Sequence, residues 1–383
     1  MSRRLVIITE IISPYRIPLF NALAQRGDID LHVIFLAETD PGLRDWKVYR
    51  NEIKFSYQVL RSWRCKIGKH NWLLNAGIGH ALESGRPAAI LCGGYNYLAS
   101  WQALLWAQMH ATPFFLWSES SLQDSRSGHP VVEFLKAEFM RHCSGFVVPG
   151  RAALDYLRFH SIGEDKIYTA VNAVDNDFFA SAAQCARRNA DQRRTELELP
   201  NRYFLFAGRL VREKGVFELL SAYATLDAAL RQQIGLVFVG DGAARQALEA
   251  ESCGVTPGTI KFAGFAQREQ LASYYALAEM LILPTYTDTW GLVVNEAMAC
   301  GLPVILSNVA GCGADLVTDH WNGRIVPPKD VKALATAMGT LASQTDLLTR
   351  MSINSKSRIL EYSPSEWSRG IARMMEATGA SRE

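Results

Sequence analysis

The sequence has little that would mark a secreted, zinc-binding or membrane-spanning protein. Its seven cysteines are scattered and form no CxxC pair, which argues against a disulfide framework or a zinc site and favours a reducing cytosol. No stretch approaches the roughly 20 uninterrupted apolar residues that a spanning helix needs. The apolar run from Leu5 is broken by Glu10 and no small-residue cleavage site follows, so we expect a buried strand there rather than a signal peptide.

The chain also lacks an excess of charge of either sign, since its 40 lysines and arginines are nearly balanced by 38 aspartates and glutamates. The formal net charge is only +2, and no concentrated stripe of cations is present, so general nucleic-acid binding is excluded. The chain has 383 residues, of which 49% are hydrophobic, enough for two globular cores. We therefore expect a globular protein with two domains.

Short apolar runs alternate with segments of helical period along the whole chain, which predicts an α/β fold with parallel sheets. We expect domains at 1–175 and 201–361, joined by a linker at 176–200 whose polar sequence favours a surface helix or a connector. The expected strands are residues 5–8, 31–36, 89–92, 114–117 and 145–148 in the first half, and 203–207, 236–239, 260–262, 280–283, 304–306 and 324–326 in the second.

The strand at 203–207 leads into a turn that combines glycine with cations. Gly208, Arg209, Lys214 and Gly215 lie between this strand and the next helical segment. Flexible glycines and a helix start provide a phosphate-binding layout, and the two cations can neutralise a departing diphosphate. The alternative is a solvated basic loop.

A second motif runs from Asp288 to Glu296 and starts a short helix near Gly291. The first turn carries no carboxylate, so the amides of Gly291, Leu292 and Val293 are available to a phosphate. Glu296 is placed to accept hydrogen bonds from ribose hydroxyls. The structural alternatives are that Asp288 only caps the helix and that Glu296 is an exposed helix residue.

Two further patterns are weak. Gly240 belongs to a GxG after the strand at 236–239, and we assign it to the same binding site as Gly208 and Arg209. The pattern is not a full dinucleotide fingerprint, because Arg245 stands where the third glycine would be. The DxD pairs at 28–30 and 175–177 do not follow strands as a metal motif should. We expect neither NAD nor a metal ion and no other cofactor, with Arg209 and Lys214 replacing the cation.

Arg209, Lys214 and the acid-x7-acid segment resemble the retaining glycosyltransferases of family four, a group of GT-B enzymes. The resemblance continues over most of the chain. Further matches are Asn172 with Asp175, Gly264 with Phe265, and the segments around 311–316 and 322–323.

The resemblance implies a GT-B fold, with two Rossmann-like domains facing a cleft and a C-terminal helix at about 362–383 that packs back on the first domain. Arg209 and Lys214 would bind the diphosphate, Glu296 the ribose and Asp288 the transferred sugar. The amides at 291–293 would hold the distal phosphate, and Gly264 and Phe265 would contact the base.

Two departures from the family pattern concern catalysis. Asp288 is one methylene shorter than the usual glutamate, and the strand at 114–117 is followed by Glu119 instead of a histidine. We assign Glu119 to catalysis and to the acceptor site. The other acceptor residues expected from the N-terminal loops are Tyr15, Arg16, Tyr95 and Asn96, and the loop 118–126 is expected to take part as well. Trp101 is expected to pack in the core.

The segment 61–72 interleaves four lysines and arginines with Trp63 and Trp72, a composition that suits an anionic membrane surface. The alternative is a solvated loop. A peripheral contact here would place a cytoplasmic protein on the inner face of the cytoplasmic membrane.

The sequence thus predicts a retaining, metal-independent hexosyltransferase that uses a sugar nucleotide, with UDP favoured, and a saccharide or lipid-linked acceptor in polysaccharide or glycolipid synthesis. Two alternatives stay open. One is a GT-B-fold sugar-nucleotide epimerase, and the other is a non-catalytic subunit that binds a sugar nucleotide.

Overall fold

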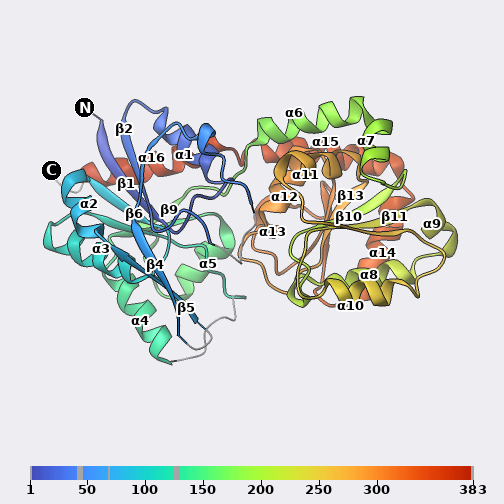
Figure 1. The fold of residues 1–383 in the computed structure, drawn as a ribbon, viewed down its shortest axis with the longest axis horizontal. Coiled ribbons are helices and arrows are strands. Elements are labelled where there is room, and N and C mark those ends of the chain that lie inside the picture. The colour runs from blue at the N-terminus through green and yellow to red at the C-terminus, as the bar shows by residue number, and fades with distance from the viewer. Residues whose placement is uncertain (1, 41–45, 68–69, 124–129, 381–383) are drawn as a thin grey trace. The chain divides into compact units, whose positions relative to one another are not determined.

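A computed structural model describes residues 2–40, 46–67, 70–123 and 130–380 (Figure 1). The chain divides into two compact units. Unit 1 comprises residues 1–174 and 364–383, and unit 2 comprises residues 175–363. Both units are built on parallel sheets, which confirms the expected α/β class.

Unit 1 contains a seven-stranded sheet in the order β3-β2-β1-β6-β7-β8-β9. Helices cover both faces, with α1 and α16 on one side and α2 to α5 on the other (Figure 1). The strands are β1 (Arg3–Thr9), β2 (Ile29–Phe35), β3 (Ser56–Val59), β6 (Ala89–Cys92), β7 (Phe114–Trp117), β8 (Gly145–Val148) and β9 (Ile167–Thr169). The helices are α1 (Ile17–Ala24), α2 (Ile78–Gly85), α3 (Leu98–Met109), α4 (Pro130–Arg141), α5 (Arg151–Phe159) and α16 (Pro364–Ala380), with 3-10 turns η1 (Arg50–Glu52) and η2 (Glu164–Lys166).

The last helix, α16, belongs to unit 1 although it follows all of unit 2 in the chain. Its Trp367 is fully buried and lies against Phe20 and Trp117, with ring centroids 5.8 and 5.4 Å away. At Gly370 a side chain would collide with the carbonyl oxygen of Thr169, so the helix backbone lies directly on β9. Burial of this aromatic face fixes the C-terminal helix on the N-terminal sheet.

Unit 2 has a six-stranded sheet in the order β12-β11-β10-β13-β14-β15. Figure 1 shows α6, α11, α12 and α15 on one face and α8, α10 and α14 on the other. The strands are β10 (Tyr203–Ala207), β11 (Gly235–Val239), β12 (Ile260–Gly264), β13 (Met280–Leu283), β14 (Val304–Ser307) and β15 (Gly323–Val326). The helices are α6 (Asn176–Arg188), α7 (Ala190–Glu196), α8 (Val216–Thr225), α9 (Ala228–Gln233), α10 (Arg245–Ser252), α11 (Arg268–Leu277), α12 (Leu292–Ala299), α13 (Gly313–Leu316), α14 (Val331–Ala342) and α15 (Thr345–Ile359), with η3 (Arg212–Lys214).

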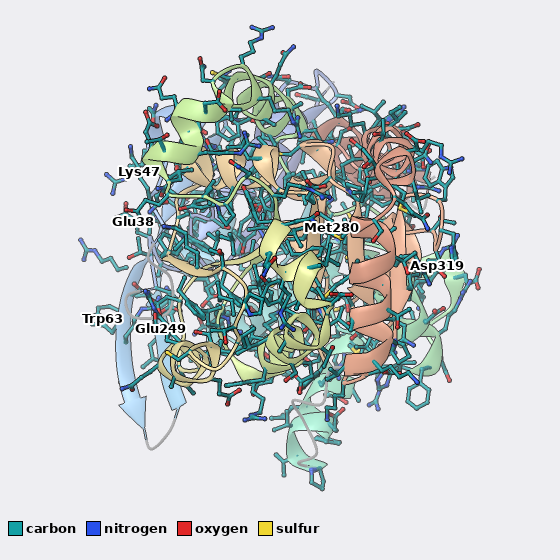
Figure 2. The ribbon with its side chains drawn as sticks, turned by 90° about the vertical axis from the view of Figure 1, so that its right-hand side faces the viewer. Glu38, Lys47, Trp63, Glu249, Met280 and Asp319 are labelled. Atoms are coloured by element: carbon teal, nitrogen blue, oxygen red, sulfur yellow. The ribbon has the colours of Figure 1, made fainter. Side chains whose placement is uncertain are left out.

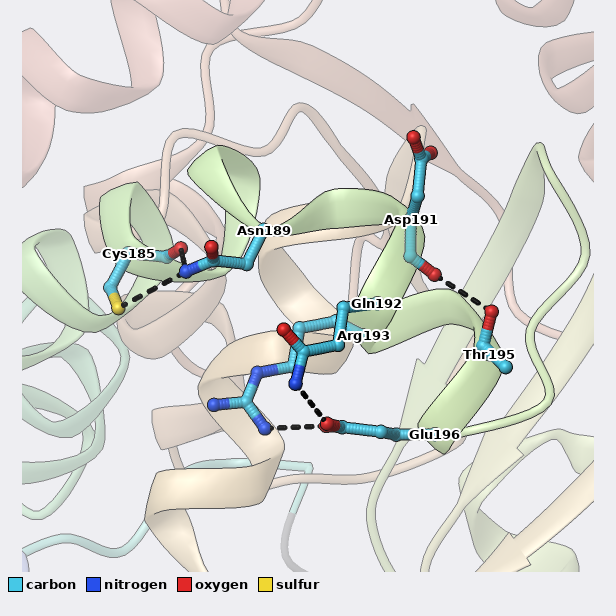
Figure 3. Close-up of polar contacts among 7 residues, drawn as sticks. All are labelled: Cys185, Asn189, Asp191, Gln192, Arg193, Thr195 and Glu196. Atoms are coloured by element: carbon cyan, nitrogen blue, oxygen red, sulfur yellow. Dashed lines mark hydrogen bonds and ion pairs between the residues drawn. The ribbon is translucent and has the colours of Figure 1, made fainter.

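The polar segment 176–200, expected to be a linker in the form of a surface helix or a connector, forms the helices α6 and α7, and both belong to unit 2 rather than lying between the units in the chain. The carboxylate of Asp175 caps α6 by accepting from the amide of Phe178 at 2.9 Å. Figure 3 shows the exposed contacts that stabilise α7, including Gln192 and Arg193, which both donate to Glu196. The segment looked like a linker because only a narrow stripe of small and aromatic side chains on α6 is buried against α11 and α12.

All the expected strands are present with small shifts at their ends, but the short edge strands β3 and β9 were missed, as was a separate hairpin. This hairpin pairs β4 (Arg61–Ile67) antiparallel with β5 (His70–Ala76), and it forms most of the cationic segment 61–72. None of the helices in the described ranges is long and apolar enough to cross a membrane.

We predict that Trp367→Ala lowers the free energy of unfolding by about 3–5 kcal/mol, because it removes a fully buried aromatic side chain. Trp63→Ala is the matched control, since Trp63 is 58% exposed and its loss should change stability by no more than about 0.5 kcal/mol. Urea unfolding followed by circular dichroism measures both. A loss below about 1 kcal/mol for Trp367→Ala would contradict the anchoring of α16.

Candidate functional site

Three strand exits of unit 2 meet through backbone contacts at the carboxyl edge of the sheet. The amide of Gly208 donates to the carbonyl of Val239 at 2.9 Å, and that of Gly240 donates to Gly264 at 2.7 Å. Gly240 has a φ of +132°, and a side chain there would collide with the carbonyl oxygen of Gly208. The glycines expected at the donor site are therefore adjacent, and Gly240 acts by letting two loops approach closely.

The turn at η3 is held on the exit of β13. Glu213 accepts two hydrogen bonds at its carbonyl oxygen, from the amide of Tyr286 at 2.8 Å and from the hydroxyl of Thr285 at 3.0 Å. Gly215 has a φ of +68° and faces the carbonyl of Pro284, where any side chain would collide. These contacts position the side chain that immediately precedes Gly215, Lys214.

Lys214 forms an ion pair with Asp288, and the two side chains are only 17% and 15% exposed. The sequence assigned both residues to one site, and the fold brings them together from positions 74 residues apart. Because the carboxylate of Asp288 already binds Lys214, the positive charge of the lysine is compensated even without a ligand. A phosphate entering the site would compete with Asp288 for Lys214.

Arg209 follows Gly208 at the same edge of the sheet and is exposed. Within the described part of the chain, its guanidinium has no hydrogen-bond or ion-pair partner, unlike Lys214. Its five donors are therefore available to an anion, and a guanidinium suits a phosphate because it can bind two oxygens at once.

Helix α12 begins at Gly291, which has a φ of +101° and provides no side chain to cap the helix. The first turn contains no acidic residue. Asp288 does not cap this helix; its carboxylate accepts from the amide of Trp290 at 3.3 Å, within its own loop. The amides of Gly291, Leu292 and Val293 are thus uncapped by any side chain, as a phosphate site at a helix start requires.

Glu296 lies one turn further along α12 and is largely buried, so the alternative of an ordinary exposed helix residue is wrong. Its Oε2 accepts a hydrogen bond from the hydroxyl of Tyr275 on α11 at 2.8 Å. Burial raises the pKa of Glu296 to about 7, although the hydrogen bond from Tyr275 lowers it. Sequence reasoning missed Tyr275, because a tyrosine on an apolar helix face is typical of core packing.

The loop after β12 presents an exposed aromatic ring rather than a charged group. Gly264 has a φ of +74°, and Phe265 beyond it is 48% exposed. Nearby Arg245 is engaged by Asp241 at 3.0 Å and Glu249 at 2.8 Å. The exposed ring of Phe265 is free to lie against a flat apolar group.

In unit 1, two of the residues assigned to the acceptor site lie together at the carboxyl edge of the sheet. Arg16 lies 3.8 Å from Glu119 and donates to the hydroxyl of Thr9 at 2.6 Å. Its guanidinium also lies over the ring of Trp117, 4.5 Å from the centroid. Asn172 donates to Glu119 at 3.4 Å. Glu119 is therefore held by a cation and an amide.

The other residues assigned to the acceptor site differ in their burial and in their contacts. Tyr15 lies edge-on against Trp46 at 5.4 Å, and Asn96 is exposed. Tyr95 is partly buried against the core, and burial raises its pKa. Trp101 packs in the core and donates to the carbonyl of Tyr95 at 3.0 Å, which confirms its expected role. The predicted acceptor loop 118–126 extends beyond the described residues at 124–126.

Residues 187–358 match the family described as Glycosyl transferases group 1. The chain carries a glycosyl transferases group 1 domain. This domain contains Arg209, Lys214, Asp288 and Glu296, and therefore the whole candidate donor site of unit 2.

Similar proteins extend this result. D-inositol 3-phosphate glycosyltransferase from Xylanimonas cellulosilytica is 28% identical over 232 residues, which cover 58% of this chain and 54% of that protein. The match thus spans about half the length of that relative. Sucrose-phosphate synthase from Thermosynechococcus elongatus superimposes with a TM-score of 0.75 at 20% identity, covering 99% of this chain and 100% of that one.

The structure of HepE from Anabaena in complex with UDP and glucose has a TM-score of 0.74 at 15% identity, covering 98% of this chain and 100% of that one. At such low identities these structures establish the fold alone. They confirm the expected GT-B fold class over nearly the full chain.

We predict that Gly215→Ala lowers the free energy of unfolding by about 2 kcal/mol or more, because alanine is strained at positive φ and collides with Pro284. Gly254→Ala is the control, since its nearest neighbour lies 3.7 Å away and its φ is not positive. Urea unfolding of both variants measures the difference. Equal stability of the two variants would show that the turn at η3 is not held as described.

Proposed function

We propose that this chain is a retaining glycosyltransferase that moves a hexose-type sugar from a UDP-sugar to a saccharide or lipid-linked acceptor. The proposal rests on the arrangement at one edge of unit 2. Among the described residues, Arg209 has no partner and no side chain caps the start of α12, and both lie in the same domain as the Lys214–Asp288 pair. A nucleoside diphosphate is the ligand whose charge matches these groups.

The proposed roles follow the chemistry of each group. Arg209 and Lys214 bind the diphosphate, and the amides at 291–293 bind its distal phosphate. Once Lys214 moves to the phosphate, Asp288 is free to accept from a hydroxyl of the transferred sugar. Glu296 accepts from the ribose, and Gly264 and Phe265 lie against the base.

In the transfer step, the bond between the anomeric carbon and the diphosphate oxygen breaks, and the diphosphate takes the electron pair. The acceptor oxygen bonds to the same face of that carbon, and its proton passes to the departing phosphate oxygen. Arg209 and Lys214 stabilise the charge that develops on the leaving group. This route requires no protein nucleophile and no metal ion, because the two side chains provide the positive charge.

The choice of UDP rests on the likeness to HepE, which was solved with UDP and glucose. The acceptor is proposed to meet unit 1 at Arg16 and Glu119, with Tyr15, Tyr95 and Asn96 nearby in the same set of loops. A sugar hydroxyl can donate to Glu119 while Arg16 orients that carboxylate.

We also propose a peripheral contact with an anionic membrane through the β4–β5 hairpin. Trp63 is labelled on this hairpin in Figure 2. It pairs across the hairpin with Leu74, and the two side chains are 58% and 37% exposed, whereas Leu73 on the opposite face is buried. The outward face therefore carries an exposed apolar pair beside the exposed cation of Arg61, which lies two residues before Trp63 on the same strand. Arg64 is not available to lipid, because it lies 2.8 Å from the buried carboxylate of Asp40; Lys69 lies outside the described residues.

Two further helices of unit 1 carry exposed apolar side chains. Helix α3 contacts β5 and contains no charged residue, and its Leu98, Leu105 and Met109 are more than half exposed. Exposed apolar side chains also occur at the start of α4, including Phe134 at 65%. An uncharged helix with exposed apolar side chains, beside the exposed Trp63 and Leu74 of a cationic hairpin, suits a membrane interface.

We predict that the chain transfers sugar from a UDP-sugar to an acceptor in the presence of EDTA with retained anomeric configuration, and that Lys214→Ala lowers kcat by about 10²–10³-fold. Lys261→Ala is the matched control, because Lys261 pairs with Glu198 on the surface of the same unit. Proton NMR of the product reads the configuration.

Inversion of configuration, or a requirement for a divalent ion, would contradict the mechanism. Release of an altered sugar nucleotide without acceptor would instead indicate the epimerase, and nucleotide binding without turnover would indicate the non-catalytic subunit. These outcomes separate the three functions.

We predict that the double variant Trp63→Ser, Leu74→Ser reduces co-sedimentation with vesicles of anionic phospholipid at least about tenfold, because each exposed apolar side chain contributes about 1–2 kcal/mol when it enters the interface. Ile353→Ser, which changes a 62% exposed apolar residue in unit 2, should have no effect. Unchanged sedimentation of the double variant would refute the contact.

A further inference from the structure

Tyr275 is a fully buried tyrosine whose hydroxyl group donates to a site residue. Its ring lies on α11, and its hydroxyl donates to Oε2 of Glu296 at 2.8 Å. The residue is 0% exposed, so the phenol cannot itself reach a ligand from solvent. Any contribution that it makes to binding must therefore act through the carboxylate of Glu296.

Two other buried tyrosines of unit 2 use their hydroxyl groups for contacts with the backbone. Tyr203 donates to the backbone carbonyl of Tyr274 at 2.7 Å, and Tyr223 donates to that of Ile234 at 2.8 Å. Both hydroxyls satisfy backbone groups within the core. Tyr275 differs because its partner is an ionisable side chain on the helix that starts at the candidate phosphate site.

The hydrogen bond has two consequences for Glu296. It holds one carboxylate oxygen in a fixed direction, which leaves the other oxygen to accept from a ligand hydroxyl. It also favours the ionised form, because a phenol that donates to a carboxylate stabilises the negative charge. An ionised and oriented carboxylate accepts hydrogen bonds from sugar hydroxyls more strongly than a neutral carboxyl group does.

We propose that Tyr275 is a positioning residue for recognition of the ribose: it orients Glu296 and keeps it ionised so that the carboxylate binds the ribose hydroxyls of the donor. This inference rests on the proposed function, because it takes Glu296 as the ribose contact. It adds a second residue, from a different helix, to the part of the site that distinguishes a ribonucleotide.

The burial of Glu296 predicts that ligand binding weakens as the pH falls. Burial raises its pKa to about 7, so the carboxylate is lost as the pH falls through that value, and ligand binding is lost with it. Removing the hydroxyl of Tyr275 removes an interaction that lowers this pKa, so binding should be lost at a higher pH.

The other titratable groups near the end of α12 come from the elements that contact it. They are Cys300 after the helix itself, Arg187 from α6, whose guanidinium donates to the carbonyl of Cys300 at 2.6 Å, and Lys356 from α15. Strand β14 contributes none. All of these groups are unchanged in a Tyr275→Phe variant, which isolates the effect of the phenol.

The test is isothermal titration calorimetry of UDP and of 2′,3′-dideoxy-UDP with the full chain, for the wild type, Tyr275→Phe and Tyr223→Phe. We expect the wild type to prefer UDP, and Tyr275→Phe to lose about tenfold in affinity for UDP while binding the dideoxy compound as the wild type does. The pH at which half of the UDP affinity is lost should rise in Tyr275→Phe. Tyr223→Phe should match the wild type in ligand preference and pH profile.

Each other outcome has a definite meaning. If Tyr275→Phe weakens both ligands equally, or leaves UDP binding and its pH profile unchanged, the positioning role is refuted while the proposed function stands. If the wild type binds neither UDP nor any other nucleoside diphosphate, the proposed function fails, and this inference fails with it. Glu296→Gln should abolish the pH dependence near neutrality, and its persistence would show that another group titrates.

Discussion

The close approach of backbone segments at the carboxyl edge of the unit 2 sheet is the constraint on which the site depends. At Gly240, Gly215 and Gly311, a side chain would collide with a carbonyl oxygen of the neighbouring loop. These contacts join the exits of β10, β11, β13 and β14 into one surface. Because the loops touch directly, the cations after β10 and the helix start after β13 occur at the same edge.

The charges on this surface are unevenly compensated. Lys214 is paired with Asp288, whereas Arg209 has no partner in the described part of the chain and the start of α12 has no capping carboxylate. Burial raises the pKa of Glu296, and the hydrogen bond from Tyr275 opposes that rise. The site is thus prepared for a ligand that carries negative charge at one end and hydroxyl groups at the other, as a nucleoside diphosphate does.

Much of the fold and of this site could be predicted from the sequence because the signals are local. Apolar strands followed by glycine, cations or acids identify the strand exits, and Arg209, Lys214, Asp288 and Glu296 were all assigned in this way. The partners of these residues were not predictable, since the Lys214–Asp288 and Tyr275–Glu296 contacts join distant segments. That residues 176–200 belong to unit 2 was missed for the same reason, because their polar sequence conceals a narrow stripe that is buried against α11 and α12.

The decisive measurement is a crystal structure of the chain with an intact sugar nucleotide. We expect the diphosphate to lie at the amides of residues 291–293 and to contact Arg209 and Lys214, with the Lys214–Asp288 ion pair broken. A nucleotide bound elsewhere, or bound here with that ion pair intact and Arg209 directed to solvent, would refute the proposed site.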